Sequence, residues 1–366
     1  MINPISRRAR SAALALVLGL GACSDSGDET SAEDTTADST ESGTTGSEIE
    51  EIRESDPESS DTTAASDDAT SVTYPMTLES PFGETELEAK PERVAVMSSI
   101  DLDIALALGV VPVISPSYGG DPEAWSLERL EQLGETELVT FDATDGVDYE
   151  AIAAAEPDVI LATSGWSLSE DYEQLSKIAP IVSFQGEDGL ASMTWAERTE
   201  EASEALDLVD EGQVVIDDVS EQFAVARDAH PEFDGKTFTY AVVHPEQVTY
   251  ISYAGSNIDF FTNLGFELPE AAAEFTDTNS AVSRENLDVL DADVLLVGYP
   301  FGDEGLMTQA ELEEDPVFTL IPAVADGRYA VVDNAIASPL AYPSPLAEPW
   351  LIEELVPVLA DATAGS

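Results

Sequence analysis

Short apolar runs recur along the chain and alternate with stretches of about ten residues that have helical spacing. The runs lie at 93–97, 112–114, 139–141, 159–162, 181–183, 238–243, 294–297 and 329–332. Such runs, separated by helices, are typical of parallel strands that helices cover on both faces. The pattern therefore predicts an α/β fold.

The alternation is interrupted by a longer helical region. Thr194 and Glu197 have the spacing of a capping box, so a helix is expected to begin there with "WAERTEEASEAL". A second helix is predicted over 209–230, because Pro231 ends a run of apolar residues at near-helical spacing. These residues are Val214, Val215, Val219, Phe223 and Val225. The α/β alternation then resumes.

This organisation predicts two Rossmann-like α/β lobes, 73–208 and 231–366, joined by a single long helix. A helix of about 20 residues spans about 30 Å and forms a stiff connection. In open α/β sheets ligands bind beyond the carboxyl ends of the strands. We therefore expect a ligand cleft between the lobes.

The residues before the first lobe have a different composition. Three arginines within positions 7–10, the apolar run 12–20 and Cys23 predict a secretory signal over 1–22. Leu20-Gly21-Ala22-Cys23 resembles a bacterial lipobox, in which the cysteine carries lipid. Ser6-Arg7-Arg8 leaves twin-arginine export as an alternative to the Sec route. Residues 23–72 are rich in Ser, Thr, Asp and Glu, and we expect an acidic, disordered tether.

The formal net charge is −62, and the tether does not account for it. Beyond residue 71 there are 59 acidic residues against six arginines and three lysines. Nucleic acid is excluded as a partner, because binding to phosphates requires clustered Lys and Arg. The composition indicates an acidic surface suited to saline surroundings, where salt screens self-repulsion.

Signatures of catalysis are missing. His230 and His244 are the only histidines, so a zinc site with three histidines is impossible. "GKT" at 235 has no preceding glycine of a phosphate loop, and "GWSLS" at 165 lacks the final glycine of a nucleophile elbow. We therefore predict a protein that is not an enzyme and that has no metal site of its own.

Large aromatic residues instead gather in or beside the loops that follow predicted strands. They are Tyr118, Trp125, Trp166, Phe184, Trp195, Tyr253, Tyr299, Phe301 and Tyr342. Each alone could cover the edge of a core, but together on two lobes they favour the lining of a ligand cleft.

A similar sequence stretch, a predicted helix followed by an apolar strand, occurs in each lobe. "DYEAIAAAEPDVILA" begins at Asp148 and "SRENLDVLDADVLLV" at Ser283, so Glu150 aligns with Glu285. Each glutamate lies in the first turn of a predicted helix, where it could simply complement the helix dipole.

Several stretches resemble the iron–siderophore and cobalamin class of ABC-transporter substrate-binding lipoproteins. They are "KPERVAVMSSIDLDIALALGVVPV", "YEAIAAAEPDVILA", "YEQLSKIAPIV", "TWAERT", "SRENLDVLDADVLLV" and "SPLAEPW". The resemblance covers about residues 74–359, with a ligand-binding domain at about 92–362. It implies two lobes joined by a rigid helix, a ligand between them and no catalysis. It also implies that Glu150 and Glu285 dock onto the permease dimer of an importer.

The resemblance further implies a monomer held by the lipid on Cys23 at the outer face of the cytoplasmic membrane. "TWAERT" is similar to ferric-siderophore binders, so the expected ligand is a ferric siderophore, with no cofactor. Alternatives are a cobalamin or haem carrier of the same fold, a lipid-anchored envelope enzyme, and a structural envelope lipoprotein.

The scarcity of basic residues bears on the ligand's charge. Arg198 is the best candidate among them to reach the cleft. A tris-catecholate ferric complex carries three negative charges, which so acidic a protein would repel. A ferric hydroxamate is neutral or weakly cationic and can be held by aromatic rings and one arginine. The hydroxamate class is therefore favoured.

We predict that the mature protein begins at a lipid-modified Cys23, with a protease-sensitive tether after it. Mass spectrometry of the N-terminal peptide tests the first part. An unmodified N-terminus upstream of Cys23 would contradict it, and protease resistance across 24–71 would contradict the second part.

Overall fold

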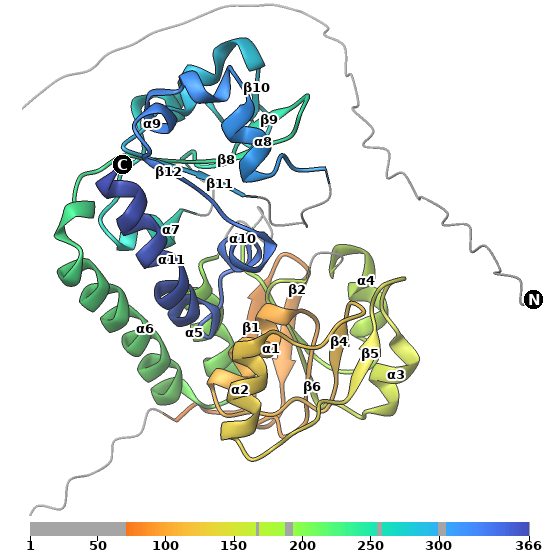
Figure 1. The fold of residues 1–366 in the computed structure, drawn as a ribbon. Coiled ribbons are helices and arrows are strands. Elements are labelled where there is room, and N and C mark those ends of the chain that lie inside the picture. The colour runs from red at the N-terminus through yellow and green to blue at the C-terminus, as the bar shows by residue number, and fades with distance from the viewer. Residues whose placement is uncertain (1–70, 166–167, 187–192, 255–257, 299–304, 366) are drawn as a thin grey trace, which may run out of the picture. The chain divides into compact units, whose positions relative to one another are not determined.

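The computed structural model describes residues 71–165, 168–186, 193–254, 258–298 and 305–365. Cys23 and most of the predicted tether lie outside the described residues, as do Trp166, Tyr299 and Phe301. Figure 1 shows the order of the elements along the chain.

In its described residues, the first lobe contains seven strands and five α-helices. They are β1 (Met76–Ser80), β2 (Gly83–Leu87), β3 (Val94–Val96), α1 (Ser99–Ala107), β4 (Ser115–Ser117), α2 (Ala124–Gln132), β5 (Thr140–Asp142), α3 (Tyr149–Ala154), β6 (Val159–Ala162), α4 (Leu168–Leu175), β7 (Ile181–Ser183) and α5 (Trp195–Ala205). Strands β3, β6 and β7 form a parallel sheet, and β4 pairs in parallel with β5. A parallel bridge between Ala95 and Ile114 connects the two sheets, so their carboxyl ends lie along one edge.

Burial explains why these segments form strands and helices. Every residue of β3, β6 and β7 is buried, as continuous apolar strands under helices should be. All residues of α1 except Ser99 are buried, including two aspartates. This helix is apolar nearly all round, which is typical of a helix enclosed by its neighbours. The antiparallel hairpin of β1 and β2 was not predicted from the sequence.

The predicted connecting helix is confirmed as α6 (Val209–Ala229). Its buried positions, Gly212, Val219, Phe223 and Ala226, lie on one face. Gly212 is required by close contact with α5, because a Cβ there would lie 2.4 Å from Ser203 Oγ. Val214 and Val225, which belong to the apolar run that predicted this helix, are exposed and lie outside its buried face.

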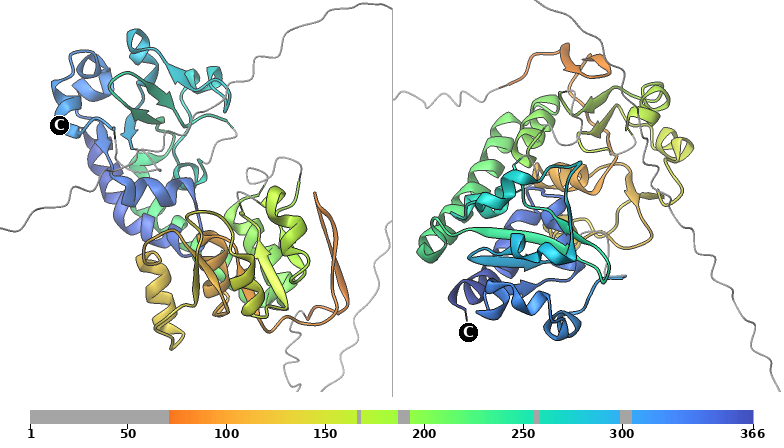
Figure 2. Two further views of the ribbon diagram at one scale, coloured as in Figure 1. Left: turned by 90° about the vertical axis from the view of Figure 1, so that its right-hand side faces the viewer. Right: turned by 90° about the horizontal axis from the view of Figure 1, so that it is seen from above.

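The second lobe follows α6. Its elements are η2 (Pro231–Phe233), β8 (Phe238–Val243), β9 (Val248–Tyr250), α7 (Asp259–Asn263), η3 (Glu270–Glu274), β10 (Ala281–Val282), η4 (Arg284–Leu290), β11 (Val294–Val297), α8 (Gln309–Glu314), η5 (Phe318–Leu320), α9 (Pro322–Ala325), β12 (Tyr329–Val331), α10 (Asn334–Ala341) and α11 (Ala347–Ala364). Its sheet has the order β10-β9-β8-β11-β12. Figure 2 shows this sheet from two further directions.

Two local expectations were wrong. The strand predicted at 112–114 begins instead at Ser115, and only Ile114 makes a bridge to β3. The second sheet is mixed rather than parallel, because β9 and β10 are antiparallel to their neighbours. The α/β class and the two lobes joined by a long helix agree with the prediction.

The lobes also share core residues. Trp195, at the start of α5, packs into the cluster formed by α6, α7, α11 and the second sheet. Conversely, Tyr342 and Leu346, between α10 and α11, pack against the core of the first lobe. Each lobe therefore places apolar side chains in the other's core.

A buried acid occurs in the first turn of α11. Glu348 is 2% exposed, and its Oε2 has no hydrogen-bond partner within the described part of the chain. Burial raises the pKa of Glu348 to about 8, and the negative charge of Asp259 contributes to the shift. The side chain is therefore mostly protonated at neutral pH.

This shift makes stability depend on pH. The native state keeps a proton on Glu348 that the unfolded chain loses near pH 4.5, so stability falls as the pH rises from about 4.5 to about 8. We expect Glu348→Gln to reduce this fall by more than about 1 kcal/mol, since one pKa unit is worth about 1.4 kcal/mol. Urea unfolding at several pH values measures it.

The matched control is Glu354→Gln, an exposed glutamate on the same helix. It removes the same charge without touching a buried group. Equal pH slopes for the wild type and Glu348→Gln would contradict the prediction.

Candidate binding site

A cavity of about 650 Å³ lies beyond the carboxyl ends of the first lobe's strands. Its lining residues follow β3, β4, β5 and β6, and α4 forms one wall. Ser338 and Tyr342, from α10 and its carboxyl end, line it from the second lobe. The volume falls within the range of small-molecule sites, and the location is the one expected for an open α/β sheet.

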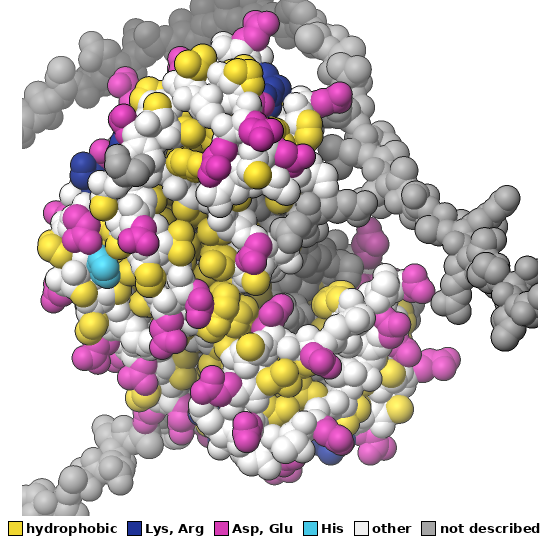
Figure 3. Space-filling model, in the orientation of Figure 1, with side chains coloured by type: hydrophobic (Ala, Val, Ile, Leu, Met, Phe, Trp, Pro, Cys, Tyr) yellow, Lys and Arg dark blue, Asp and Glu magenta, His cyan; other side chains and the backbone are white. Residues whose placement is uncertain are grey.

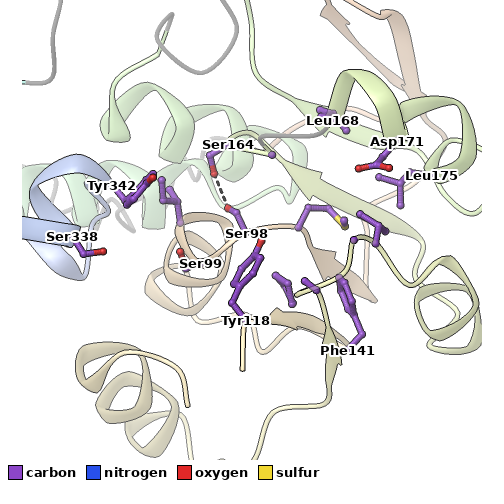
Figure 4. A pocket seen from close by; sticks show the side chains of 17 residues that line it. Ser98, Ser99, Tyr118, Phe141, Ser164, Leu168, Asp171, Leu175, Ser338 and Tyr342 are labelled. Atoms are coloured by element: carbon purple, nitrogen blue, oxygen red, sulfur yellow. Dashed lines mark hydrogen bonds between the residues drawn. The ribbon is translucent and has the colours of Figure 1, made fainter. Parts of the chain in front are cut away.

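The lining is apolar with several hydroxyl groups (Figure 4). The apolar side chains are Met97, Ile100, Pro116, Phe141, Ala143, Val147, Leu168 and Leu175. The hydroxyl groups belong to Ser98, Ser99, Tyr118, Ser164, Ser338 and Tyr342. Asp171 supplies one carboxylate. Such a surface can hold a bulky ligand by ring and methyl contacts and can orient it through hydroxyl groups.

Two of these serines are held by a buried carboxylate. Asp101, on α1, is 1% exposed and accepts hydrogen bonds from Ser98 Oγ at 2.6 Å and from Thr163 Oγ1 and N at 2.6 and 2.9 Å. Ser98 and Ser164 bond to each other at 2.7 Å. Burial raises the pKa of Asp101, while these hydrogen bonds and the charge of Arg198 oppose the shift. The network joins the loop after β3 to the loop after β6.

A second buried carboxylate lies where the lobes meet. Asp103 accepts hydrogen bonds from Trp125 Nε1 at 2.8 Å, from Ser344 Oγ at 2.6 Å and from Ser126 Oγ. Trp125 also lies against Trp350 of α11, with ring centroids 5.0 Å apart. Burial raises the pKa of Asp103 to about 6 in spite of the three donors. This contact connects α1 and α2 to the segment between α10 and α11.

Two of the predicted aromatic residues line the cavity. Tyr118, which follows β4, is 64% exposed, and Tyr342 lines the cavity from the second lobe. Trp166, Tyr299 and Phe301 lie outside the described residues, so their predicted role stays a prediction.

The structure places the other predicted contacts away from this lining. Phe184 and Trp195 are buried in hydrophobic cores, and Trp125 is bonded to Asp103. Tyr253 follows β9 and does not line the cavity. Arg198 is buried on α5, where its Nε donates to the Thr163 carbonyl at 3.2 Å. This bond is to the residue before Ser164, and Arg198 is not among the described lining residues.

The serines and Asp171 were missed from the sequence. Ser98 and Ser164 follow the ends of β3 and β6, which is where ligand contacts are expected in this fold. Serine is also common in any turn and at any helix start, so its presence there did not distinguish a ligand contact.

All nine cationic side chains beyond residue 71, one of them on α6, have partners outside the cavity. Lys90, Lys177, Arg227, Lys236 and Arg284 form ion pairs with Asp207, Glu173, Asp234, Asp293 and Asp315. Arg93, Arg129, Arg198 and Arg328 donate to backbone carbonyls. Figure 3 shows acidic side chains spread over one face, with few basic ones among them. Within the described residues, the cavity is therefore lined by no cation.

The two glutamates of the duplicated element are exposed. Glu150 lies in the first turn of α3, where Asp148 caps the helix, and Glu285 lies in η4 after the cap Ser283. One is on each lobe. Arg284, beside Glu285, pairs with Asp315 instead.

Among the described residues of the lining there is no histidine and no cysteine. Across the described ranges, no cluster of three or more His, Cys, Asp or Glu side chains could hold a metal ion. His230 bonds to Glu232, and His244 bonds to the Gly305 carbonyl. None of the described helices is both long enough and apolar enough to cross a membrane.

A ligand cavity built from two helix-linked α/β lobes defines a binding protein of the two-lobed type. The profile of the periplasmic binding protein family matches residues 94–335. The chain belongs to this family, whose members are binding proteins and not enzymes.

Relatives and solved structures agree with this assignment. The chain is 27% identical over 219 residues to a probable siderophore-binding lipoprotein, YfiY, of Bacillus subtilis. That match covers 57% of this chain and 64% of the relative. It is 23% identical to the Fe(3+)-citrate-binding protein YfmC of the same organism, over 69% of this chain and 76% of that protein.

Among solved structures, it resembles PiaA, an iron uptake ABC transporter substrate-binding protein of Streptococcus pneumoniae. The identity is 30% and the TM-score 0.68, over 80% of this chain and 100% of PiaA. PiaA in complex with ferrichrome gives 29% identity and a TM-score of 0.67, over 79% of this chain and 98% of that one.

Proposed function

We propose that this protein is the substrate-binding component of an ABC importer and that it captures a ferric siderophore outside the cell. The cavity of about 650 Å³ carries the proposal, because it is apolar, rich in hydroxyl groups and walled by both lobes. The likeness to PiaA and to YfiY supports the same ligand class. A lipid on Cys23 would hold the protein at the outer face of the cytoplasmic membrane. We propose that the protein is a monomer there.

The lining favours a hydroxamate chelate. Three hydroxamate anions balance the charge of ferric iron, so the metal core of such a complex is neutral. Tyr118 and Tyr342 can contact its apolar surface, while the serine hydroxyls can donate to its oxygens. A tris-catecholate keeps three negative charges, and within the described residues no cation lines the cavity to balance them.

We expect a neutral ferric tris-hydroxamate to bind at least about tenfold more tightly than a ferric tris-catecholate. The reason is that a desolvated, unpaired anion is costly. Tryptophan-fluorescence titrations with both chelates at matched salt concentration measure the difference. Tighter binding of the catecholate at low salt would refute the charge argument, and failure of both chelates to bind would refute the proposed function.

Delivery to the membrane is proposed to use Glu150 and Glu285, which are exposed on separate lobes. Charges of this kind on an interface rim govern docking more than they govern ligand affinity. A permease with two subunits would offer one basic contact to each lobe.

Glu150→Ala and Glu285→Ala should each lower chelate uptake by at least about tenfold while leaving ligand affinity nearly unchanged. Uptake of radiolabelled iron and titration of the purified variants measure the two effects. Glu221→Ala, at an exposed position on α6, is the matched control. If ligand affinity falls together with uptake in the docking variants, the docking role is wrong.

A further inference from the structure

Within the described residues, Asp171 is the one charged side chain that lines the cavity. It lies on α4, near one end of the lining, beside Leu168 and Leu175 (Figure 4). The other polar groups of the described lining are neutral hydroxyls. The described lining therefore carries negative charge at one known position.

The position of Asp171 on its helix is unusual for a solvated acid. Leu168, Asp171 and Leu175 have the spacing i, i+3 and i+7, so they share one face of α4. Both leucines are buried, whereas Glu170 and Glu173 are exposed. A carboxylate thus occupies a place in the apolar face, where it points toward the ligand volume rather than into solvent.

A neighbouring helix holds this carboxylate in place. Tyr149, at the start of α3, donates a hydrogen bond from its phenol to Asp171 Oδ1. This bond raises the pKa of Tyr149 to about 12, so the phenol keeps its proton and remains a donor. A carboxylate has about four lone-pair sites and can accept further donors from a ligand.

A ligand in the cavity changes the solvation free energy of the Asp171 carboxylate. A bulky ligand displaces the water that solvates the carboxylate, and an apolar ligand surface would leave this desolvation uncompensated. A cationic ligand group would instead form a charge-assisted hydrogen bond in a site where solvent screening is reduced. In the part of the lining that the structure describes, no Lys or Arg side chain is present to take that role.

From these observations we propose that the cavity selects ferric chelates bearing a protonated amine, and that Asp171 is the counter-ion of the ammonium group. This specificity rests on the proposed siderophore-binding function. The ligand class is a ferric tris-hydroxamate with a free primary amine, which carries a net charge of one positive unit. Asp171 acts as a specificity-determining residue at the α4 wall, away from the hydroxyl groups that face the chelate core.

The test compares two chelates that differ only in this charge. One is the ferric complex of a linear tris-hydroxamate with a terminal primary amine, and the other is the same complex with the amine acetylated. Wild-type protein should bind the ammonium form about tenfold more tightly, which corresponds to about 1.4 kcal/mol. Asp171→Asn should bring the two affinities within about twofold of each other, mainly by weakening the ammonium form.

Glu170→Gln is the matched control, because it removes one negative charge from the adjacent, exposed position. It should keep the tenfold preference. The asparagine can still accept the Tyr149 hydrogen bond, and thermal unfolding of each variant checks that α4 remains folded.

Equal affinities of the two chelates for the wild type would overturn the proposal, and so would an unchanged preference in Asp171→Asn. In both cases tight binding of the acetylated chelate would leave the siderophore-binding function intact. Failure of both chelates to bind the wild type would instead overturn the proposed function together with this specificity.

Discussion

Asp101 is an almost completely buried carboxylate, and the loops that form the cavity floor are arranged around it. Its oxygens accept hydrogen bonds from Ser98 and from the Thr163 hydroxyl and amide, which belong to the turns after β3 and β6. A buried acid is tolerated only when its oxygens are satisfied, so the two turns must keep the distance that these bonds allow. Ser98 and Ser164 therefore line the cavity at fixed positions. The cavity floor is thus determined by a polar group that the ligand need not touch.

A similar arrangement two residues later on the same helix positions the opposite wall. Asp103 accepts from Trp125 and from Ser344, and Ser344 Oγ also accepts from the amide of Ala347 at the start of α11. The same hydroxyl therefore connects the lobes and accepts a hydrogen bond from the first amide of a helix of the second lobe. Tyr342 lies only two residues before Ser344, so this contact also positions a ring that lines the cavity. One helix, α1, carries both acids, and its burial on all sides makes it a rigid reference for both walls.

Much of this fold could be predicted from the sequence because the central strands are short, apolar and β-branched. The predicted bounds of β6, β7, β8 and β11 coincide with the observed ones. The β1–β2 hairpin was missed because only one apolar side chain in β1 and one in β2 are buried, Leu78 and Leu87. Strands with so little apolar pattern resemble loops, and their pairing depends on neighbours distant in sequence.

The site was harder to predict than the fold. Aromatic size and position after strands indicated Tyr118 and Tyr342, but the same criteria also indicated Phe184 and Trp195, which fill cores. The local sequence does not distinguish an aromatic residue that lines the cavity from one that fills a core, because its burial depends on how other helices pack against it. The acids of "DLDIALAL" have the pattern of an ordinary helix start, where carboxylates favour the dipole. Their burial, and hence their structural importance, follows only from the tertiary structure.

The acidic groups of this protein affect a charged chelate in two ways, at long range from the surface and at short range from the cavity lining. The acidic surface produces a field that salt weakens, since the Debye length is about 8 Å at physiological ionic strength. A chelate approaching the protein in a saline medium is therefore little affected by the surface charge. Inside the cavity solvent and salt screen less, so a charge within hydrogen-bonding distance of Asp171 interacts with it more strongly than with an acid on the open surface. Salt concentration should thus govern how often charged chelates reach the cavity, whereas the lining governs which of them remain. A protein whose surface is so acidic can still discriminate between chelates by charge, because discrimination depends on the few groups that the bound ligand desolvates.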